Sequence, residues 1–223
     1  MEARLASGAG VAQLLDPDDP AWNHAGEDPV QLIGTPAGLQ PTAAIRNTWA
    51  GKKIGAVERV QVRAVHNGEL LAFRLEWDDP TQNDSLTDTT AFPDAAAIAF
   101  PASPDAVTAT MGAPGAGVNA WYWRADEKGG GRHVVAEGLG SSRTLDSGVV
   151  LGSGVWKGGR WRVVIARALK LKTSEPVAQL EPGQVTGYAV AVWDGAHQER
   201  AGIKGFSGDW RELHLAPEPM ARK

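Results

Sequence analysis

The sequence predicts an all-β fold: an antiparallel β-sandwich of two sheets with short helices and long loops. Three observations support this prediction. Several segments alternate between apolar and polar residues with a period of two. Two pairs of such segments are joined by strong turn signals. The chain also contains 27 Gly and 14 Pro among its 223 residues, which favours many short strands and turns over long helices.

The size of the chain predicts one domain over residues 1–223, with enough residues for a sizeable core. Residues 1–44 are rich in Pro, Gly, Ala and Asp and show no sustained periodicity. They are therefore expected to form an irregular N-terminal arm. No internal repeat, low-complexity tract or linker divides the remaining sequence.

The first predicted hairpin follows this arm. Residues 60–64 alternate, with Val60 and Val62 on one face. Asn67-Gly68 comes next, a dipeptide that suits a tight hairpin because both residues tolerate positive φ. Residues 71–77 then alternate again. We therefore expect a half-buried antiparallel hairpin.

A second hairpin is predicted where residues 149–156 lead through Gly158-Gly159 into the alternating residues 161–165. Two short segments, residues 105–110 and 166–172, are weak helix candidates. The further strand candidates are residues 95–100, 120–124, 132–136, 184–193 and 210–215.

Composition excludes several function classes. The net charge of -4 and the pI near 5.7 argue against nucleic acid or an anionic membrane as partner. The absence of Cys excludes disulfides, iron–sulfur ligation, thiolate catalysis and covalent c-type haem attachment. No apolar run reaches the roughly 18 residues of a membrane span. The N-terminus shows no signal-peptide pattern, which fits either a protein without one or a mature form with a new initiator Met.

No self-contained catalytic apparatus is expected. The five His residues lie apart in the sequence, and none of the usual nucleophile, P-loop or dinucleotide motifs occurs. Most of the nine Trp residues should anchor the core, although some could line a flat cofactor or stack on sugar rings. An acidic loop follows Trp77. It fits either a plain turn or a Ca²⁺ site, without the spacing of an EF-hand. Its acidic residues are Asp78, Asp79, Asp84 and Asp88.

Two residues have unusual settings. Met111 is the only Met away from the chain ends and borders a Gly-rich loop. Lys204 lies between Ile203 and Gly205-Phe206, an apolar and cramped position for a lysine. On local sequence alone, a gap-filling Met and a Lys with a solvated ammonium group remain the ordinary interpretations.

The chain resembles the haem b (gamma) subunits of ethylbenzene dehydrogenase-like enzymes, in the type II branch of the dimethyl sulfoxide reductase family. The likeness spans roughly residues 45–215, and its most specific part is Trp193-Asp194-Gly195 with the downstream Lys204. Residues 206–209 depart from the family pattern before the final Trp. The stretches that carry the likeness are residues 75–79 with 92–96, 161–167 and 191–200.

The resemblance implies one b-type haem with Met111 and Lys204 as its axial iron ligands, and no catalytic residues in this chain. The haem pocket is expected between loops at one end of the sandwich. Ligation requires a neutral Lys204 amine. Losing the proton at pH 7 costs about 4–5 kcal/mol from an ordinary lysine pKa, and burial lowers that cost. A thioether ligand tends to raise the reduction potential of haem.

The resemblance also implies a heterotrimer that is usually periplasmic, with a cytoplasmic complex as the alternative. An alpha subunit would carry the molybdenum cofactor and a beta subunit the iron–sulfur clusters. This chain would relay electrons between the iron–sulfur subunit and an external cytochrome or quinone pathway.

Two other interpretations stay open at this stage. One is a carbohydrate-binding β-sandwich with exposed Trp and a Ca²⁺ loop. The other is a structural subunit of the same complex that has lost the haem. If haem binds without Lys204, His133 and His197 are the next ligand candidates.

Overall fold

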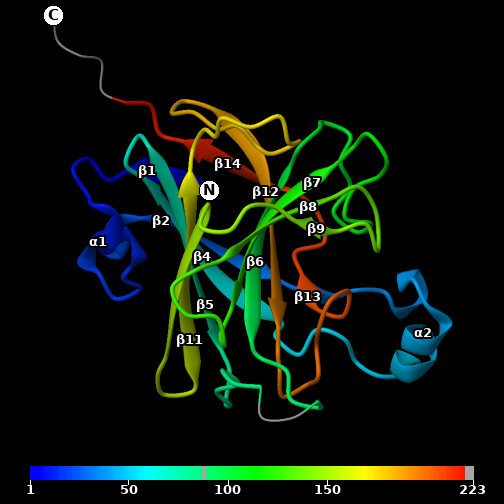
Figure 1. Cartoon of the computed structure of the whole chain (residues 1–223). Coiled ribbons are helices and arrows are strands. Elements are labelled where there is room, and N and C mark those ends of the chain that lie inside the picture. The colour runs from blue at the N-terminus through cyan, green and yellow to red at the C-terminus, as the bar shows by residue number, and fades with distance from the viewer. Residues whose placement is uncertain (87–88, 219–223) are drawn as a thin grey trace, which may run out of the picture.

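The computed structural model describes residues 1–86 and 89–218 and consists mainly of strands (Figure 1). The first seven strands are β1 (Glu2–Leu5), β2 (Gly26–Gln31), β3 (Ile33–Gly34), β4 (Arg59–His66), β5 (Leu70–Asp78), β6 (Ala95–Pro101) and β7 (Val118–Arg124). The others are β8 (Arg132–Ala136), β9 (Arg143–Thr144), β10 (Val150–Trp156), β11 (Arg160–Ala168), β12 (Val185–Trp193), β13 (Gly205–Phe206) and β14 (Arg211–Leu215). The helices are α1 (Val11–Leu15) and α2 (Ala43–Trp49), with 3-10 turns η1 (Pro20–His24) and η2 (Ala37–Leu39).

Both predicted hairpins are confirmed as β4–β5 and β10–β11, and they lie side by side because β11 also pairs with β5. Leu75 faces Val62 on one side and Val163 on the other. Residues in register across a sheet share a face, so the apolar sets of three strands combine into one buried surface.

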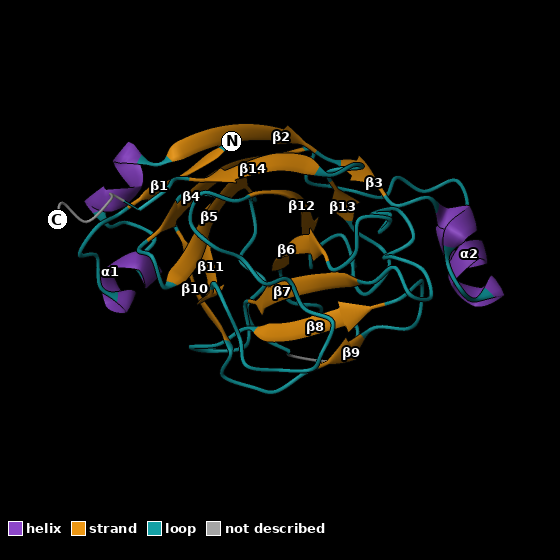
Figure 2. Cartoon of the chain, turned by 90° about the horizontal axis from the view of Figure 1, so that it is seen from above, coloured by secondary structure: helices purple, strands orange, loops and turns teal. Residues whose placement is uncertain are grey.

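The strands form one hydrogen-bonded path around a central core (Figure 2). Its order is β10-β11-β5-β4-β1-β14-β12-β6-β7-β8-β9. The short β1 joins the two layers, because it pairs in parallel with β4 on one side and β14 on the other. All other strand pairs are antiparallel among the described residues. The all-β sandwich prediction is confirmed.

Aromatic side chains from facing strands fill the core. Phe73 of β5 packs against Phe100 of β6 and Tyr188 of β12, with ring centroids 5.9 and 5.7 Å away. Phe100 and Trp121 lie 4.6 Å apart. Such contacts add to the stabilisation from burying large apolar areas.

Residues 1–44 differ from the predicted irregular arm, because β1 and β2 are members of the sheets. The partners of β1 lie far away in the chain: Glu2 pairs with His214 and Leu5 with His66. In β2, an edge strand, Pro29 interrupts the sequence pattern but is tolerated because an edge strand need not donate on both sides. Neither feature produces local periodicity, which explains why the strands were not predicted.

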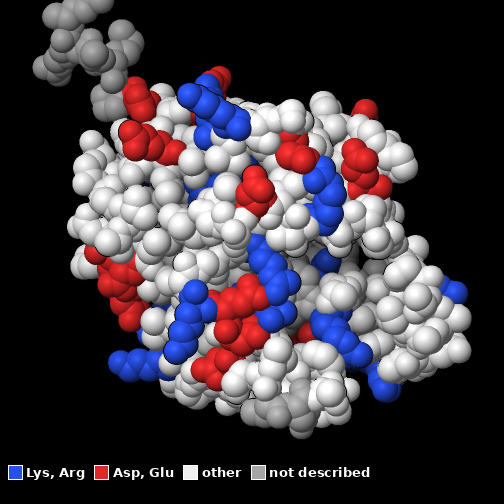
Figure 3. All heavy atoms as spheres, viewed as in Figure 1, with Lys and Arg blue, Asp and Glu red and all other residues white. Residues whose placement is uncertain are grey.

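Both weak helix candidates are wrong. Residues 166–168 complete β11, whose pairing with β5 overrides local propensity, and residues 105–110 form turns. Within the described ranges the helices are short, and none of them could cross a membrane. On the face shown in Figure 3, acidic and basic side chains are interspersed rather than gathered into one basic patch.

One arginine is fully buried in the sandwich. Arg167 of β11 has 0% exposure, and its guanidinium lies 4.7 Å from the Trp121 ring centroid. It donates to Asn119 Oδ1 at 3.1 Å and to the carbonyl oxygens of Leu169 and Ala178. These bonds tie the segment that follows β11 to β7. Burial lowers the Arg167 pKa to about 10, so the side chain stays cationic at pH 7.

Candidate functional site

A cavity of about 360 Å³ lies on the outer face of the β6–β7–β8–β12 layer. Its floor follows from strand alternation: Ile98 and Trp121 point into the sandwich core, so their neighbours point outward. These outward positions carry mostly small residues, which leave room above the sheet. The floor residues are Ala97, Ala99, Val118, Ala120, Tyr122, Val134, Ala136, Ala189, Ala191 and Trp193.

Loops form the walls of this cavity, as expected of the long loops predicted from the sequence. They come from four parts of the chain that strand pairing brings together. The lining is predominantly apolar with few polar groups, which is typical of a cofactor or small-molecule site. The wall residues include Thr35, Leu39, Gln40, Thr108, Met111, Leu139, Gly202, Lys204, Phe206 and Trp210.

Met111 enters the cavity from a strained turn. Its φ is 56° and that of Gly112 is 83°, both in the left-handed region. A Cβ on residue 112 would lie 2.5 Å from the Ala116 carbonyl oxygen, so only Gly fits there. The Met111 carbonyl accepts a hydrogen bond from Gly138 N at 3.0 Å, which fixes the turn. A non-glycine residue in this conformation costs on the order of 1–3 kcal/mol, and such strain concentrates at functional sites.

Lys204 enters from a different loop, directly before β13. Its backbone is fixed by Thr35, whose N–H donates to the Lys204 carbonyl at 3.0 Å. The side chain is buried, and among the described residues no carboxylate pairs with it. Its Nζ lies 5.1 Å from the Trp193 ring centroid. Burial lowers the Lys204 pKa to about 8, which brings the neutral amine within reach near physiological pH.

The two residues singled out in the sequence thus meet in space. Lys204 Nζ and Met111 Sδ are 3.7 Å apart, although the residues are 93 positions apart in the chain. Metal–nitrogen and metal–sulfur bonds are each about 2.0–2.3 Å long. Two ligands on opposite sides of one metal ion would therefore lie about 4.0–4.6 Å apart. The amine and the thioether are in hydrogen-bonding contact at present, and they would have to separate by less than about 1 Å to hold a metal between them.

Trp193, which the sequence indicates only as part of the family motif, packs against Lys204 in the cavity. Its indole N–H donates to the Ala201 carbonyl at 3.0 Å, and Ala201 has a φ of 51°. The bond holds the turn that leads into Lys204. The floor of the cavity was also not identified from the sequence. Small residues at outward strand positions indicate such a floor, here Ala97, Ala99 and Ala191.

Neither alternative histidine lines the cavity. His133 points into the sandwich core, 3.4 Å from Arg167 Nη1. His197 packs near Trp49 and contacts the Lys53 carbonyl at 3.0 Å. Of the acidic loop, Asp78, Asp79 and Asp84 are described and lie outside the cavity lining, whereas Asp88 lies outside the described residues.

Because His133 is buried, the free energy of unfolding should depend on pH. Burial, followed by the nearby Arg167 charge, lowers its pKa to about 4. The ordinary pKa of histidine is 6.5, so between pH 6.5 and about pH 4 the unfolded chain binds a proton at His133 that the folded chain does not bind. This stability is fully present above pH 6.5 and is lost as the pH falls, by about 2 kcal/mol between pH 7.5 and 5. Urea unfolding of wild type and His133→Gln at both pH values measures it. An equally steep loss in the variant would contradict this assignment.

The chain is similar to one protein family and to gamma subunits of reductases and dehydrogenases. The profile of the family described as Ethylbenzene dehydrogenase matches residues 19–148 and 139–205. Chlorate reductase subunit gamma of Ideonella dechloratans is 35% identical over 213 residues, which cover 95% of this chain and 84% of that protein. Dimethylsulfide dehydrogenase subunit gamma of Rhodovulum sulfidophilum is 31% identical, over 96% of this chain and 80% of its own length.

The chain is also similar to a third curated protein and to a solved structure. A protein of Haloferax mediterranei, provisionally named as a respiratory nitrate reductase heme subunit, is 30% identical over 98% of this chain and 76% of its own length. Among solved structures, a family 9 carbohydrate-binding module from Caldicellulosiruptor kristjanssonii, in complex with glucose, superimposes with a TM-score of 0.52. Both chains are fully covered, at 11% identity. This last similarity shows the sandwich fold alone.

Proposed function

The chain belongs to the ethylbenzene dehydrogenase family, and we propose that it is an electron-transfer subunit in which one domain holds a single b-type haem between Met111 and Lys204. The observation that carries the proposal is the 3.7 Å approach of these two side chains inside an apolar cavity. The Haloferax mediterranei relative, whose provisional name includes a heme subunit, supports the same cofactor.

Each residue of the site has a definite task. The Met111 turn, held by the bond from Gly138 N to the Met111 carbonyl, positions the thioether in the cavity. Burial disfavours the ammonium form of Lys204, so its lone pair is available to a metal. When bound, a haem with two protein ligands supplies reversible one-electron storage. With Met111 and Lys204 both holding the iron, O₂ and substrate would have no free position on it.

We further propose that the chain functions in a periplasmic heterotrimer. The two gamma-subunit relatives support assembly with other subunits. In this arrangement the alpha subunit holds the molybdenum cofactor and the beta subunit the iron–sulfur clusters. This chain relays electrons between the beta subunit and an external cytochrome or quinone pathway. Co-purification of three subunits from the periplasmic fraction tests the assembly and its location together.

Haem titration of the purified full chain tests the cofactor. We expect saturable uptake of one iron protoporphyrin per chain, in competition with a weak haem scavenger. Acid–acetone should then extract the haem completely, because the chain has no Cys for covalent attachment. Its pyridine haemochrome spectrum should be that of b-type haem. Failure to saturate at one equivalent would contradict the proposal and favour a haem-less structural subunit.

A further inference from the structure

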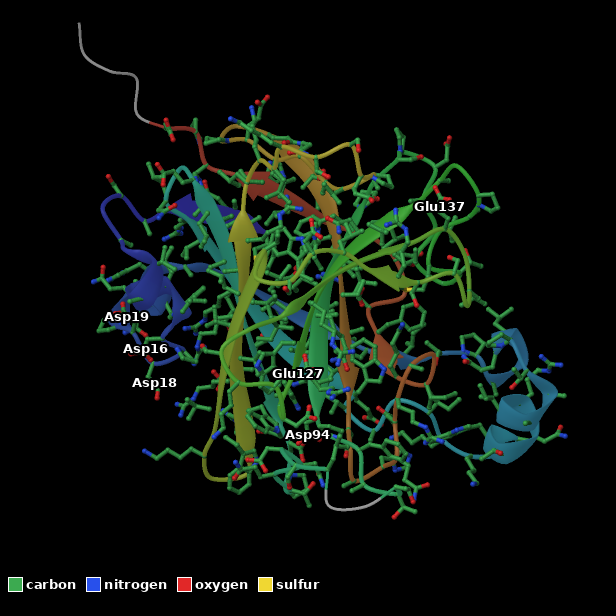
Figure 4. All side chains as sticks on the ribbon, viewed as in Figure 1. Asp16, Asp18, Asp19, Asp94, Glu127 and Glu137 are labelled. Carbon is green, nitrogen blue, oxygen red and sulfur yellow. The ribbon has the colours of Figure 1, made fainter. Side chains whose placement is uncertain are left out.

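Three aspartates from separate parts of the chain meet at the end of the sandwich where Asp94 is labelled in Figure 4. Asp79 follows β5, Asp94 precedes β6 and Asp194 follows β12. One carboxylate oxygen of each lies within 4.8 Å of the others. Asp79 and Asp94 are buried, with 1% and 0% exposure, and Asp194 is half-buried.

Backbone and indole N–H groups hold Asp94 and Asp194 in place. Asp94 Oδ2 accepts from Asn83 N and from Trp161 Nε1, both at 2.9 Å, and its Oδ1 accepts from Gly195 N at 2.8 Å. Asp194 Oδ1 accepts from His197 N at 3.0 Å. A carboxylate provides about four acceptor positions, so both groups retain acceptor capacity after these bonds.

Asp79 supplies an independent sign that the trio is incomplete. Its Oδ1 accepts from the Thr81 N–H and hydroxyl, at 3.0 and 3.1 Å. Its Oδ2 is buried and makes no hydrogen bond, although the Trp77 indole N–H, which also lacks a partner, lies close enough to lower the pKa of this carboxyl. A buried polar atom without a partner costs about 1–3 kcal/mol or more if charged, and it requires an explanation.

The charge of the trio is also unbalanced. Among the described residues, no Lys, Arg or His forms an ion pair with Asp79, Asp94 or Asp194. Burial, and then the charge of a neighbouring aspartate, raises the pKa of Asp79 and brings that of Asp94 to about 7. A cation between the carboxylates would offset both effects.

We propose that Asp79, Asp94 and Asp194 bind one Ca²⁺ ion. The donor set consists of oxygen alone, which suits Ca²⁺ or Mg²⁺ rather than zinc, copper or iron. Ca²⁺ accepts six to eight oxygen ligands in irregular arrangements, whereas Mg²⁺ requires a near-ideal octahedron. The site is separate from the haem cavity and does not depend on the proposed electron-transfer function. It would fasten the start of the segment from Asp194 to Lys204.

Terbium luminescence of the full chain, stripped with a chelator, tests this site directly. Tb³⁺ replaces Ca²⁺ in oxygen sites, and the Trp161 indole bonded to Asp94 is close enough to sensitise it. We expect bright emission on excitation of tryptophan, displaced by Ca²⁺ in a one-to-one titration and only weakly by Mg²⁺. The melting temperature should rise when Ca²⁺ is restored. No sensitised emission and no thermal shift at millimolar Ca²⁺ would overturn the proposal.

A matched pair of variants locates the ion. Asp194→Asn removes one charge from the half-buried member of the trio and should weaken Ca²⁺ binding at least tenfold. Asp84→Asn removes the same charge from an exposed residue of the loop that joins Asp79 to Asp94 and should leave the affinity unchanged. Equal affinities in wild type and Asp194→Asn would place the ion elsewhere and contradict the site. The wild-type titration decides the matter even if Asp194→Asn folds poorly.

Discussion

Replacing Lys204 with alanine should turn the reconstituted protein from a low-spin into a high-spin haem protein and weaken haem binding at least tenfold. The amine is the only nitrogen base that faces Met111 in the described part of the cavity. Without it, the sixth position is left to water, a weak-field ligand. The visible spectrum should lose its sharp α band, and electron paramagnetic resonance should show a high-spin ferric signal.

Two variants make this result specific. Lys170→Ala removes an exposed lysine paired with Glu181 and should leave the spectrum unchanged. Lys204→His supplies another nitrogen ligand from the same position and should restore part of the low-spin signal. If Lys204→Ala retains the wild-type spectrum, lysine is not a ligand and the assignment fails.

Replacing Arg167 with methionine should destabilise the fold by about 3 kcal/mol or more. Methionine fills a similar apolar volume, but the carbonyl oxygen of Ala178 then loses its donor inside the protein, and that of Leu169 keeps only the N–H of Leu180. Asn119 loses one donor as well. Because the segment after β11 is held by these bonds, it should also become more susceptible to proteolysis. Equilibrium unfolding in urea measures the loss.

The control for this variant is Arg160→Met on the same strand. Arg160 is exposed and pairs with Glu76 and Asp78 at the surface, so its loss should cost less than about 1 kcal/mol. Similar costs for the two variants would show that the buried network contributes no more than a surface ion pair.

The sequence predicted those parts of the fold that have local causes. The two hairpins are specified by period-two alternation and by Asn67-Gly68 or Gly158-Gly159 between the strands. The strand β1 escaped prediction because both of its partners are distant in sequence. Arg167 lies at an inward position of β11, on the same face as Ile165. Its burial depends on acceptors in the loop that folds back over it, which no local pattern specifies.

The candidate site could be predicted only in part, because its residues come together through contacts between distant parts of the chain. Met111 and Lys204 were conspicuous individually, but only the pairing of β12 with β13 and the turn before Gly112 bring them within 3.7 Å. The acidic loop directed attention to Asp78, Asp79 and Asp84. The trio found in the structure keeps only Asp79 and adds partners from the ends of two other strands.

The most direct test of the account is the reduced-minus-oxidised visible spectrum of the wild-type chain with one equivalent of haem, together with near-infrared magnetic circular dichroism of the ferric form. We expect a sharp low-spin b-type α band and a charge-transfer band in the range of amine–thioether ligation. A high-spin spectrum, or a band characteristic of histidine ligation, would contradict the pairing of Met111 with Lys204 at the iron.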